Sequence, residues 1–341
     1  MDDSVFKISD QIKTISGGFR HVAILGAGAS KASCIDNPEK TNLSIPLMDD
    51  LPKIIDLKDE FSDLSDDLIN QNFENIFSNL FEKEPNSKRL NDIEYKIYNY
   101  FNSLRLPDSP TIYDYLVLSL RKKDLIATFN WDPFLWQAYE RQSRFTKNLP
   151  LLSFLHGNVA IGYCDETKTF GPNGYLNAKT GKPFIPTKLL YPIKNKDYNS
   201  NPFINAQWNT LSKFLEKPAR VTIFGYSAPV TDVEAISIMK KAWGNPEKDQ
   251  QLAQFEIIDI QSERKLTNSW KNFIFSHHYE TTNDFFKSSI IRFPRRTGEV
   301  FNASYLEAKF YEENYPPKFQ TIEEMWEWYR PFIIEEEKQN K

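Results

Sequence analysis

Cysteine and glycine are both scarce in this chain of 341 residues. Its two cysteines are Cys34 and Cys164, and no Cys-x-x-Cys pair occurs. Two thiols cannot build a four-thiolate zinc site, so we expect no bound metal. Because only 12 glycines are present, each place where they gather is informative.

A basic excess and a long apolar run are missing as well. The 42 basic and 46 acidic residues give a net charge of −4, which argues against direct nucleic-acid binding. No apolar run approaches the roughly 18 residues of a membrane span. The N-terminus lacks the basic and apolar regions of a secretory signal, so we expect a cytoplasmic protein without membrane attachment.

Apolar runs that alternate with helical patterns indicate the fold class. Such runs are typical of parallel strands buried on both faces, and their alternation with helices predicts an α/β doubly wound parallel sheet. The predicted strands are 21–26, 125–129, 151–155, 220–224 and 255–260.

Apolar residues at helical spacing fill much of the chain between the first two predicted strands. Phe73, Ile76, Phe77, Leu80 and Phe81 form one such pattern. We therefore expect a helical insertion over about 49–120, which we interpret as a packing element without catalytic residues. Residues 157–192 are rich in loop formers and can hold a hairpin. The predicted organisation is a domain over 1–300 and a C-terminal helical extension over 301–341.

The first predicted strand ends in a glycine turn, Gly26-Ala27-Gly28-Ala29-Ser30. Gly26 permits a sharp turn from strand to helix. Gly28 lets backbone amides approach a diphosphate at a helix N-terminus. A turn of this kind without a ligand is an equally common outcome.

Two further strand ends carry polar side chains that suit catalysis. Thr128-Phe129-Asn130-Trp131-Asp132 follows one strand, and His156 ends the next, just before Gly157. An amide can orient a ribose or a water, and an imidazole can act as a general base. The alternatives are structural: a turn-forming Asn130, Asp132 as a helix N-cap and a structural His156.

The later strands end in Gly225-Tyr226-Ser227 and in Asp259. The Ser227 hydroxyl can bind a phosphate or a ribose, and Asp259 can accept from ribose hydroxyls. Turn and cap roles explain these residues equally well. The carboxyl ends of parallel strands meet at one edge, so we expect a single nucleotide site there.

These motifs, in this order, resemble the sirtuin superfamily, in particular its divergent prokaryotic sirtuin-like (silent information regulator-like) branch. Gly26–Ser30 is similar to the family's Gly-Ala-Gly-x-Ser, and Ile45-Pro46 falls where the family has its Gly-Ile-Pro cofactor loop. Thr128–Asp132 resembles Thr-Gln-Asn-Ile-Asp. Leu155-His156-Gly157 matches the catalytic Leu-His-Gly, and Gly225–Ser227 resembles a Gly-x-Ser loop. The resemblance covers roughly residues 20–260 and implies a Rossmann-like, sirtuin-type sheet.

Two departures from the family pattern argue against deacylation as the implied activity. The four-cysteine zinc ribbon that follows Leu-His-Gly in deacylases is replaced by a segment with Cys164 alone, and Leu47-Met48 replaces Phe-Arg after the loop proline. The resemblance therefore implies an NAD glycohydrolase of bacterial antiviral defence, which releases ADP-ribose and nicotinamide. The alternatives are an NAD-dependent deacylase or ADP-ribosyltransferase, and a non-catalytic nucleotide-sensing module.

The resemblance also implies residue roles. Asn130 positions the ribose or water, His156 acts on a ribose hydroxyl or as base, and Asp132 holds the carboxamide. By the same resemblance, the residues expected to contact the diphosphate and the adenosine are Gly26–Ser30, Pro46, Thr128, Gly225–Ser227 and Asp259. Since an NAD-consuming toxin must be silent at rest, we expect homo-oligomerisation or a partner protein to supply the trigger.

Overall fold

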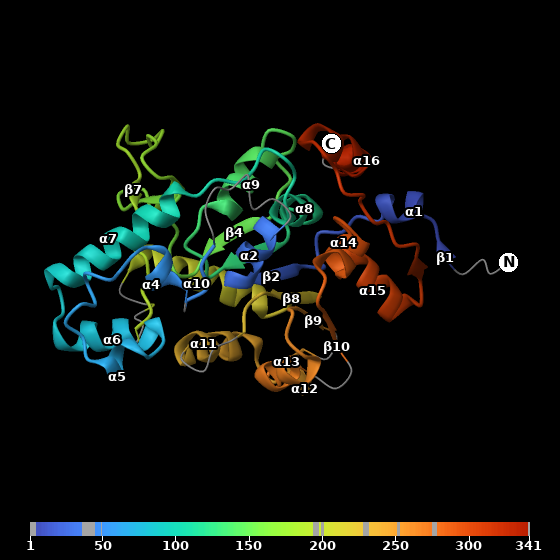
Figure 1. The fold of residues 1–341 in the computed structure, drawn as a ribbon. Coiled ribbons are helices and arrows are strands. Elements are labelled where there is room, and N and C mark those ends of the chain that lie inside the picture. Colours follow the sequence, from blue (N-terminus) through green and yellow to red (C-terminus); the bar gives the residue numbers. More distant parts are fainter. Residues whose placement is uncertain are drawn as a thin grey trace.

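A computed structural model describes residues 5–35, 45–48, 50–193, 198, 201–227, 232–250, 253–274 and 278–339 of the chain. Its centre is a six-stranded parallel sheet in the order β10-β9-β8-β2-β3-β4 (Figure 1). The strands are β2 (His21–Leu25), β3 (Leu125–Thr128), β4 (Leu151–Phe154), β8 (Arg220–Phe224), β9 (Gln254–Ile258) and β10 (Tyr279–Thr282). This arrangement confirms the predicted doubly wound α/β fold.

The middle strands are buried on both faces, as their apolar sequences predict. Every residue of β2, β3 and β8 is buried. β2 pairs with β3 on one side and with β8 on the other, so that Val22 faces both Leu125 and Val221. β10 was missed from sequence because Tyr-Glu-Thr-Thr is half-buried at the sheet edge and lacks a continuous apolar run.

Helices cover both faces of this sheet. In Figure 1, α11 and α13 lie on one side, and α8 and α9 lie on the other. Outside the insertion the helices are α1 (Ile8–Lys13), α2 (Ala27–Ile35), α9 (Phe134–Gln142), α10 (Pro202–Leu215), α11 (Val233–Trp243), α12 (Pro246–Asp249), α13 (Glu263–Trp270), α14 (Ser289–Arg292), α15 (Thr297–Glu307) and α16 (Ile322–Gln339). α8 (Ile112–Ser119) is the last helix of the insertion and packs against the sheet layer beside α9. A short 3-10 helix, η1, spans Phe285–Lys287.

The helical insertion forms one end of the molecule (Figure 1). It contains α4 (Leu51–Ile54), α5 (Asp66–Ile69), α6 (Phe73–Lys83) and α7 (Lys88–Ser103). Side chains cap the two longer helices: Asn72 accepts the N–H of Asn75, and Ser87 accepts that of Leu90. The predicted apolar face of α6 is buried except for Phe81, which is exposed.

Two small sheets complete the fold. β5 (Ile161–Cys164), β6 (Thr169–Pro172) and β7 (Ile185–Pro186) form an antiparallel sheet, where the sequence predicted that a hairpin could form. β1 (Val5–Phe6) pairs with β11 (Phe310–Tyr311) and joins segments from the two ends of the chain.

The last helix belongs to the core. α16 begins with a reciprocal cap, in which the Thr321 hydroxyl accepts from the N–H of Glu324 and the Glu324 carboxylate accepts from that of Thr321. Met325, Tyr329 and Phe332 on its inner face are fully buried. Across the described residues, no helix is both long and apolar enough to cross a bilayer.

Candidate active site

The strand order places a topological switch point between β2 and β8. From β2 the chain continues outward to β3 and β4, whereas from β8 it continues the opposite way to β9 and β10. Open α/β sheets bind ligands beyond the carboxyl ends of the strands at such a point. Gly26 follows β2 and Gly225 follows β8, so the two glycine motifs predicted from sequence flank it.

The two glycine loops are in direct backbone contact. The N–H of Gly26 donates to the Phe224 carbonyl, and that of Gly28 donates to the Gly225 carbonyl, each at 3.0 Å. A Cβ at Gly225 would lie 2.3 Å from the backbone nitrogen of Ala29, and Gly225 has a φ of +61°. Only glycine fits there. The Gly28 N–H, which we expected to face a diphosphate, is therefore engaged within the chain.

A buried polar cluster lies beside the glycine turn. The Asn130 amide nitrogen donates to the Gly26 carbonyl and to the Ser30 hydroxyl, both at 2.8 Å. The Ser30 hydroxyl also lies 2.6 Å from the Asp132 carboxylate and 2.7 Å from the Tyr113 hydroxyl. The structure thus brings Ser30, Asn130 and Asp132 together.

Proton counting assigns the donors in this cluster. Ser30 has one hydroxyl proton, and the Asp132 carboxylate needs it. Ser30 must therefore accept from both Asn130 and Tyr113. Burial raises the pKa of Asp132 to about 6, although hydrogen bonds from Ser30 and from the N–H of Phe134 oppose this rise. A carboxyl with such a pKa can exchange a proton near neutrality.

Asp132 lies one residue further from the next helix than predicted. α9 begins at Phe134 with Pro133 as its N-cap residue, and the Asp132 side chain accepts the N–H of Phe134 at 3.1 Å. The carboxylate therefore both supports the start of α9 and binds Ser30. Its capping role and its place in the polar cluster coexist.

His156 lies in an aromatic environment. Its Nε2 is 3.0 Å from the Tyr198 hydroxyl, and its ring packs edge-on against Phe129 with centroids 4.9 Å apart. Gly157 has a φ of +76°, and a Cβ there would lie 2.3 Å from the Lys188 carbonyl oxygen. Glycine after His156 is thus required by backbone packing.

Asn130 and His156 point toward different neighbours. The amide faces the glycine turn, whereas the imidazole faces Tyr198. Phe129, the residue before Asn130, stacks on Tyr226 at 4.2 Å and also touches His156. All five of these ring or amide side chains are buried, and His156 is 7% exposed. The site is therefore closed by its own aromatic residues in this structure.

The other predicted contact residues differ in their surroundings. Thr128 is buried, and its hydroxyl accepts the N–H of Asn130. Pro46 is buried, and Ser227 is exposed at the end of the second glycine loop. Asp259 follows β9, where its carboxylate accepts the N–H of Gln261, a turn role that the sequence also allowed.

Three residues of this region were not found from sequence. Tyr113 comes from the helical insertion, which the sequence pattern predicts to be a packing element without catalytic residues. Tyr198 contacts His156 from a loop. Asn158 donates to the carbonyls of Asn130 and Asp132, at 3.2 and 2.6 Å, and so joins two strand ends. Its place directly after His156-Gly157 was the one available signal.

The small antiparallel sheet beyond His156 is held by close packing. A Cβ at Gly162 would lie 2.6 Å from the Phe184 Cβ, and one at Gly171 would lie 2.5 Å from its ring. Phe184 thus fills the space between two strands. Among the residues that the structure describes, no three His, Cys, Asp or Glu side chains form a group that could hold a metal ion.

Comparison with known proteins gives structural matches alone. No family model and no curated protein matches the sequence. Two matching structures are Sir2 homologue mutants in complex with ADP ribose, each at 14% identity over 98% of this chain and 97% of the other, with TM-scores of 0.37 and 0.40. A Sir2 structure with a deacetylated p53 peptide and 3'-O-acetyl ADP ribose matches at 12% identity over 89% of this chain and 100% of that one, with a TM-score of 0.36. At these scores the matches add nothing to the fold assigned from the strand order.

Proposed function

We propose that this protein is an NAD glycohydrolase that releases nicotinamide and ADP-ribose. One observation carries the proposal: the carboxyl ends of four adjacent strands, β8, β2, β3 and β4, hold all the predicted catalytic side chains and both glycine loops. In a doubly wound sheet this edge is where a dinucleotide binds. The ordered motifs that resemble those of sirtuins specify NAD among dinucleotides.

Asn130 and Asp132 would act on the nicotinamide ribose. The bond between nicotinamide and ribose breaks through an oxocarbenium-like transition state, and nicotinamide leaves readily, so the protein mainly has to position the ribose and a water. Asn130 is held by Gly26 and Ser30 and can present its amide oxygen. Asp132, with a pKa of about 6, would bind the carboxamide.

His156 would serve as the base for the incoming water or for a ribose hydroxyl. Burial raises the pKa of Tyr198, so its phenol stays protonated and can donate to Nε2 of His156. That contact would hold the neutral imidazole with its own proton on Nδ1. Tyr198 would then be a positioning residue, acting on the substrate through His156.

NAD entry would require the second glycine loop to move. Tyr226 stacks on Phe129, and its hydroxyl donates to Asp232 at 3.0 Å, so the ring covers the centre of the site. Outward movement of Tyr226 would expose Phe129 and His156 together. Gly26–Ser30, Ser227 and Asp259 would then contact the diphosphate and adenosine side.

We place this activity in defence of bacteria against phage by NAD depletion, as the resemblance to the sirtuin-like defence branch suggests. A toxic NAD hydrolase has to be restrained, and the closed site is compatible with restraint. Self-assembly or a partner protein would supply the trigger for turnover, whereas transient opening of the second glycine loop would be enough for NAD to bind.

The test is to incubate the purified chain, over a range of protein concentrations, with NAD and to separate the products by chromatography. We expect nicotinamide and free ADP-ribose without an acyl or protein acceptor. Asn130→Ala and His156→Ala should each lower turnover by roughly a hundredfold or more. Asn102→Ala, at an exposed position of α7, is the matched control and should keep the wild-type rate.

A binding measurement distinguishes a protein that is inactive because its trigger is missing from a protein that does not use NAD at all. Calorimetry with NAD should show binding to the folded His156→Ala protein even when turnover is lost. Wild-type protein that neither binds nor consumes NAD overturns the proposal. If products appear only when an acylated peptide or a protein acceptor is present, the reaction is group transfer and not hydrolysis.

A further inference from the structure

A cavity lies at the opposite edge of the sheet from the candidate active site. Its volume is about 830 Å³, and its wall includes residues 15–17, which precede β2, and 121–123, which precede β3. Residues 143–148 and the last turns of α16 complete the wall. This volume falls in the range of small-molecule sites and far exceeds the space that a single ion needs.

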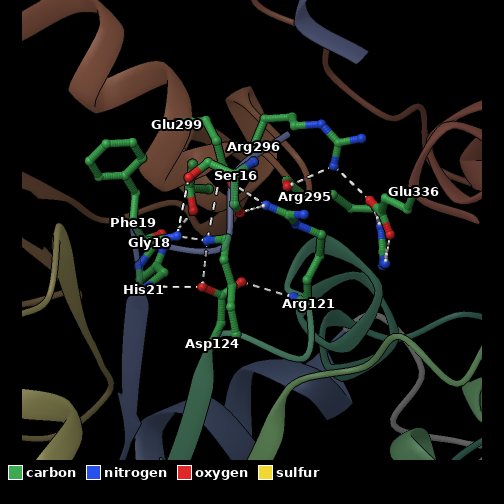
Figure 2. A network of polar contacts seen from close by, with 12 residues as sticks. Ser16, Gly18, Phe19, His21, Arg121, Asp124, Arg295, Arg296, Glu299 and Glu336 are labelled. Carbon is green, nitrogen blue, oxygen red and sulfur yellow. Dashed lines mark hydrogen bonds and ion pairs between the residues drawn. The ribbon is translucent and has the colours of Figure 1, made fainter. Parts of the chain in front are cut away.

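Figure 2 shows a buried network of ion pairs, and three of its members, Arg121, Lys123 and Glu336, line this cavity. We call this network the floor of the cavity. Arg121 pairs with Glu299, and Lys123 lies 2.8 Å from Asp124 and 3.6 Å from Glu299. Arg295 and Arg296 share the carboxylate of Glu336, at 2.5 and 2.6 Å. Each of these side chains is at least nine-tenths buried.

The network is not electrically balanced. Its four cations, Arg121, Lys123, Arg295 and Arg296, face three carboxylates, so one positive charge is in excess. The Nε of Arg121 and the Oε2 of Glu299 are both buried without a hydrogen-bond partner, and of these two residues Arg121 lines the cavity. Buried charges are normally paired and hydrogen-bonded. An uncompensated cation and an orphaned donor at the floor of a cavity therefore point to an anion.

The rim adds further positive charge. Lys122, Arg144 and Lys147 line the cavity with exposed side chains, and Glu337 is the one exposed carboxylate among its lining residues. Lys147 donates to the Ser143 carbonyl, which leaves its charge uncompensated. The chain as a whole has a net charge of −4, so this positive lining is a local property.

We propose that this cavity binds a small ligand with two or more phosphate groups, of the nucleotide or polyphosphate class. The buried floor supplies one excess positive charge, and the rim supplies three cations against one carboxylate, which suits a ligand with several negative charges. The size of the cavity suits a nucleotide better than a single phosphate. This site is separate from the proposed NAD site, because it lies at the amino-terminal ends of β2 and β3.

Calorimetry with pyrophosphate and with ATP at near-physiological salt tests the proposal. We expect both probes to bind the wild-type chain, and the double variant Arg144→Glu/Lys147→Glu to weaken binding by about tenfold or more, because charge-assisted contacts to phosphate are lost. The control variant Lys83→Glu/Lys88→Glu makes the same charge change at exposed positions of the insertion and should bind as wild type does.

Two further binding measurements test whether the phosphate compound binds at this cavity or at the active site, and whether a nucleic acid is the preferred ligand. The His156→Ala protein should bind pyrophosphate as wild type does, whatever the outcome of the NAD assay. The proposal is overturned if neither probe binds, or if binding persists in Arg144→Glu/Lys147→Glu with the same affinity. If a labelled oligonucleotide binds more tightly than ATP, the ligand of this cavity is a nucleic acid rather than a small phosphate compound.

Discussion

The Ser30 hydroxyl lies 2.6 Å from the Asp132 carboxylate, although 102 residues separate them in the chain. Ser30 ends the glycine turn and Asp132 follows β3, so this hydrogen bond ties together two strand ends of the candidate site. Both side chains are buried, and Asn130 and Tyr113 bind the same hydroxyl. The protonation of Asp132, which this hydrogen bond opposes, therefore affects both the stability of the fold and the proposed chemistry.

Asp132→Asn should change how stability depends on pH. The pKa of Asp132 is about 6 in the folded chain, against an ordinary value of 3.8, so the folded state binds more protons between these values. The charged carboxylate thus lowers stability as pH rises through this window. Relative to wild type, Asp132→Asn should gain up to about 3 kcal/mol of unfolding free energy between about pH 4 and pH 7.

Urea unfolding at both ends of that pH range measures the effect. A difference between the two proteins that does not change with pH would contradict the raised pKa. Ser30→Ala is the companion variant. It removes a hydrogen bond that lowers the pKa of Asp132 in the folded chain, so the upper end of the pH window should move to higher pH while the lower end stays in place.

Gly225→Ala should destabilise the protein strongly. The new Cβ would lie 2.3 Å from the Ala29 nitrogen, in a backbone conformation with positive φ. Overpacking and strain together predict a loss of about 2–4 kcal/mol, read as a lower midpoint of thermal unfolding. Gly174→Ala is the control: its φ is also positive, but nothing lies within 4 Å of the new Cβ, so about 1 kcal/mol is expected. Equal losses would show that the loop contact is unimportant.

Tyr198→Phe should lower the NAD turnover number about tenfold with little change in KM, because it removes the hydroxyl that orients His156 while keeping the ring. The pH–rate profile should shift as well, which a purely structural role would not cause. Tyr175→Phe, at an exposed position between β6 and β7, is the matched control. Wild-type kinetics in Tyr198→Phe would remove Tyr198 from the proposed mechanism.

Glu336→Gln should loosen the C-terminal helix. Burial alone would raise the pKa of Glu336, but Arg295 and Arg296 lower it to about 2, below the ordinary 4.5. Its contribution is therefore present above about pH 4.5 and is lost as pH falls toward about 2. At neutral pH, Glu336→Gln leaves two buried arginines without their shared carboxylate, which costs about 3–5 kcal/mol in chemical denaturation.

The neighbouring carboxylate provides the comparison. Glu335→Gln removes an ion pair with Lys338 near the surface of the same helix and should change stability by no more than about 0.5 kcal/mol. Similar losses in the two variants would mean that burial of the Arg295–Arg296–Glu336 group contributes little to stability.

Local sequence was sufficient to predict five strands of the sheet and where they end. Each apolar run that ends in glycine or a polar residue marks a buried parallel strand and its carboxyl end, and five of the six strands follow this rule. Since parallel strands end at a common edge, the neighbourhood of Gly26, Asn130, His156 and Gly225 could be predicted without coordinates.

The directions of the side chains at that edge were not predictable in this way. Asn130 faces the glycine turn because Gly26 and Ser30, at least 100 residues away, accept from its amide, and His156 faces Tyr198 because Phe129 and Trp208 pack around both rings. Tyr113 enters the site from an insertion whose own pattern reports only a buried helix face. A periodic pattern records which residues are buried, whereas the partner that each buried group meets depends on how distant segments pack against one another.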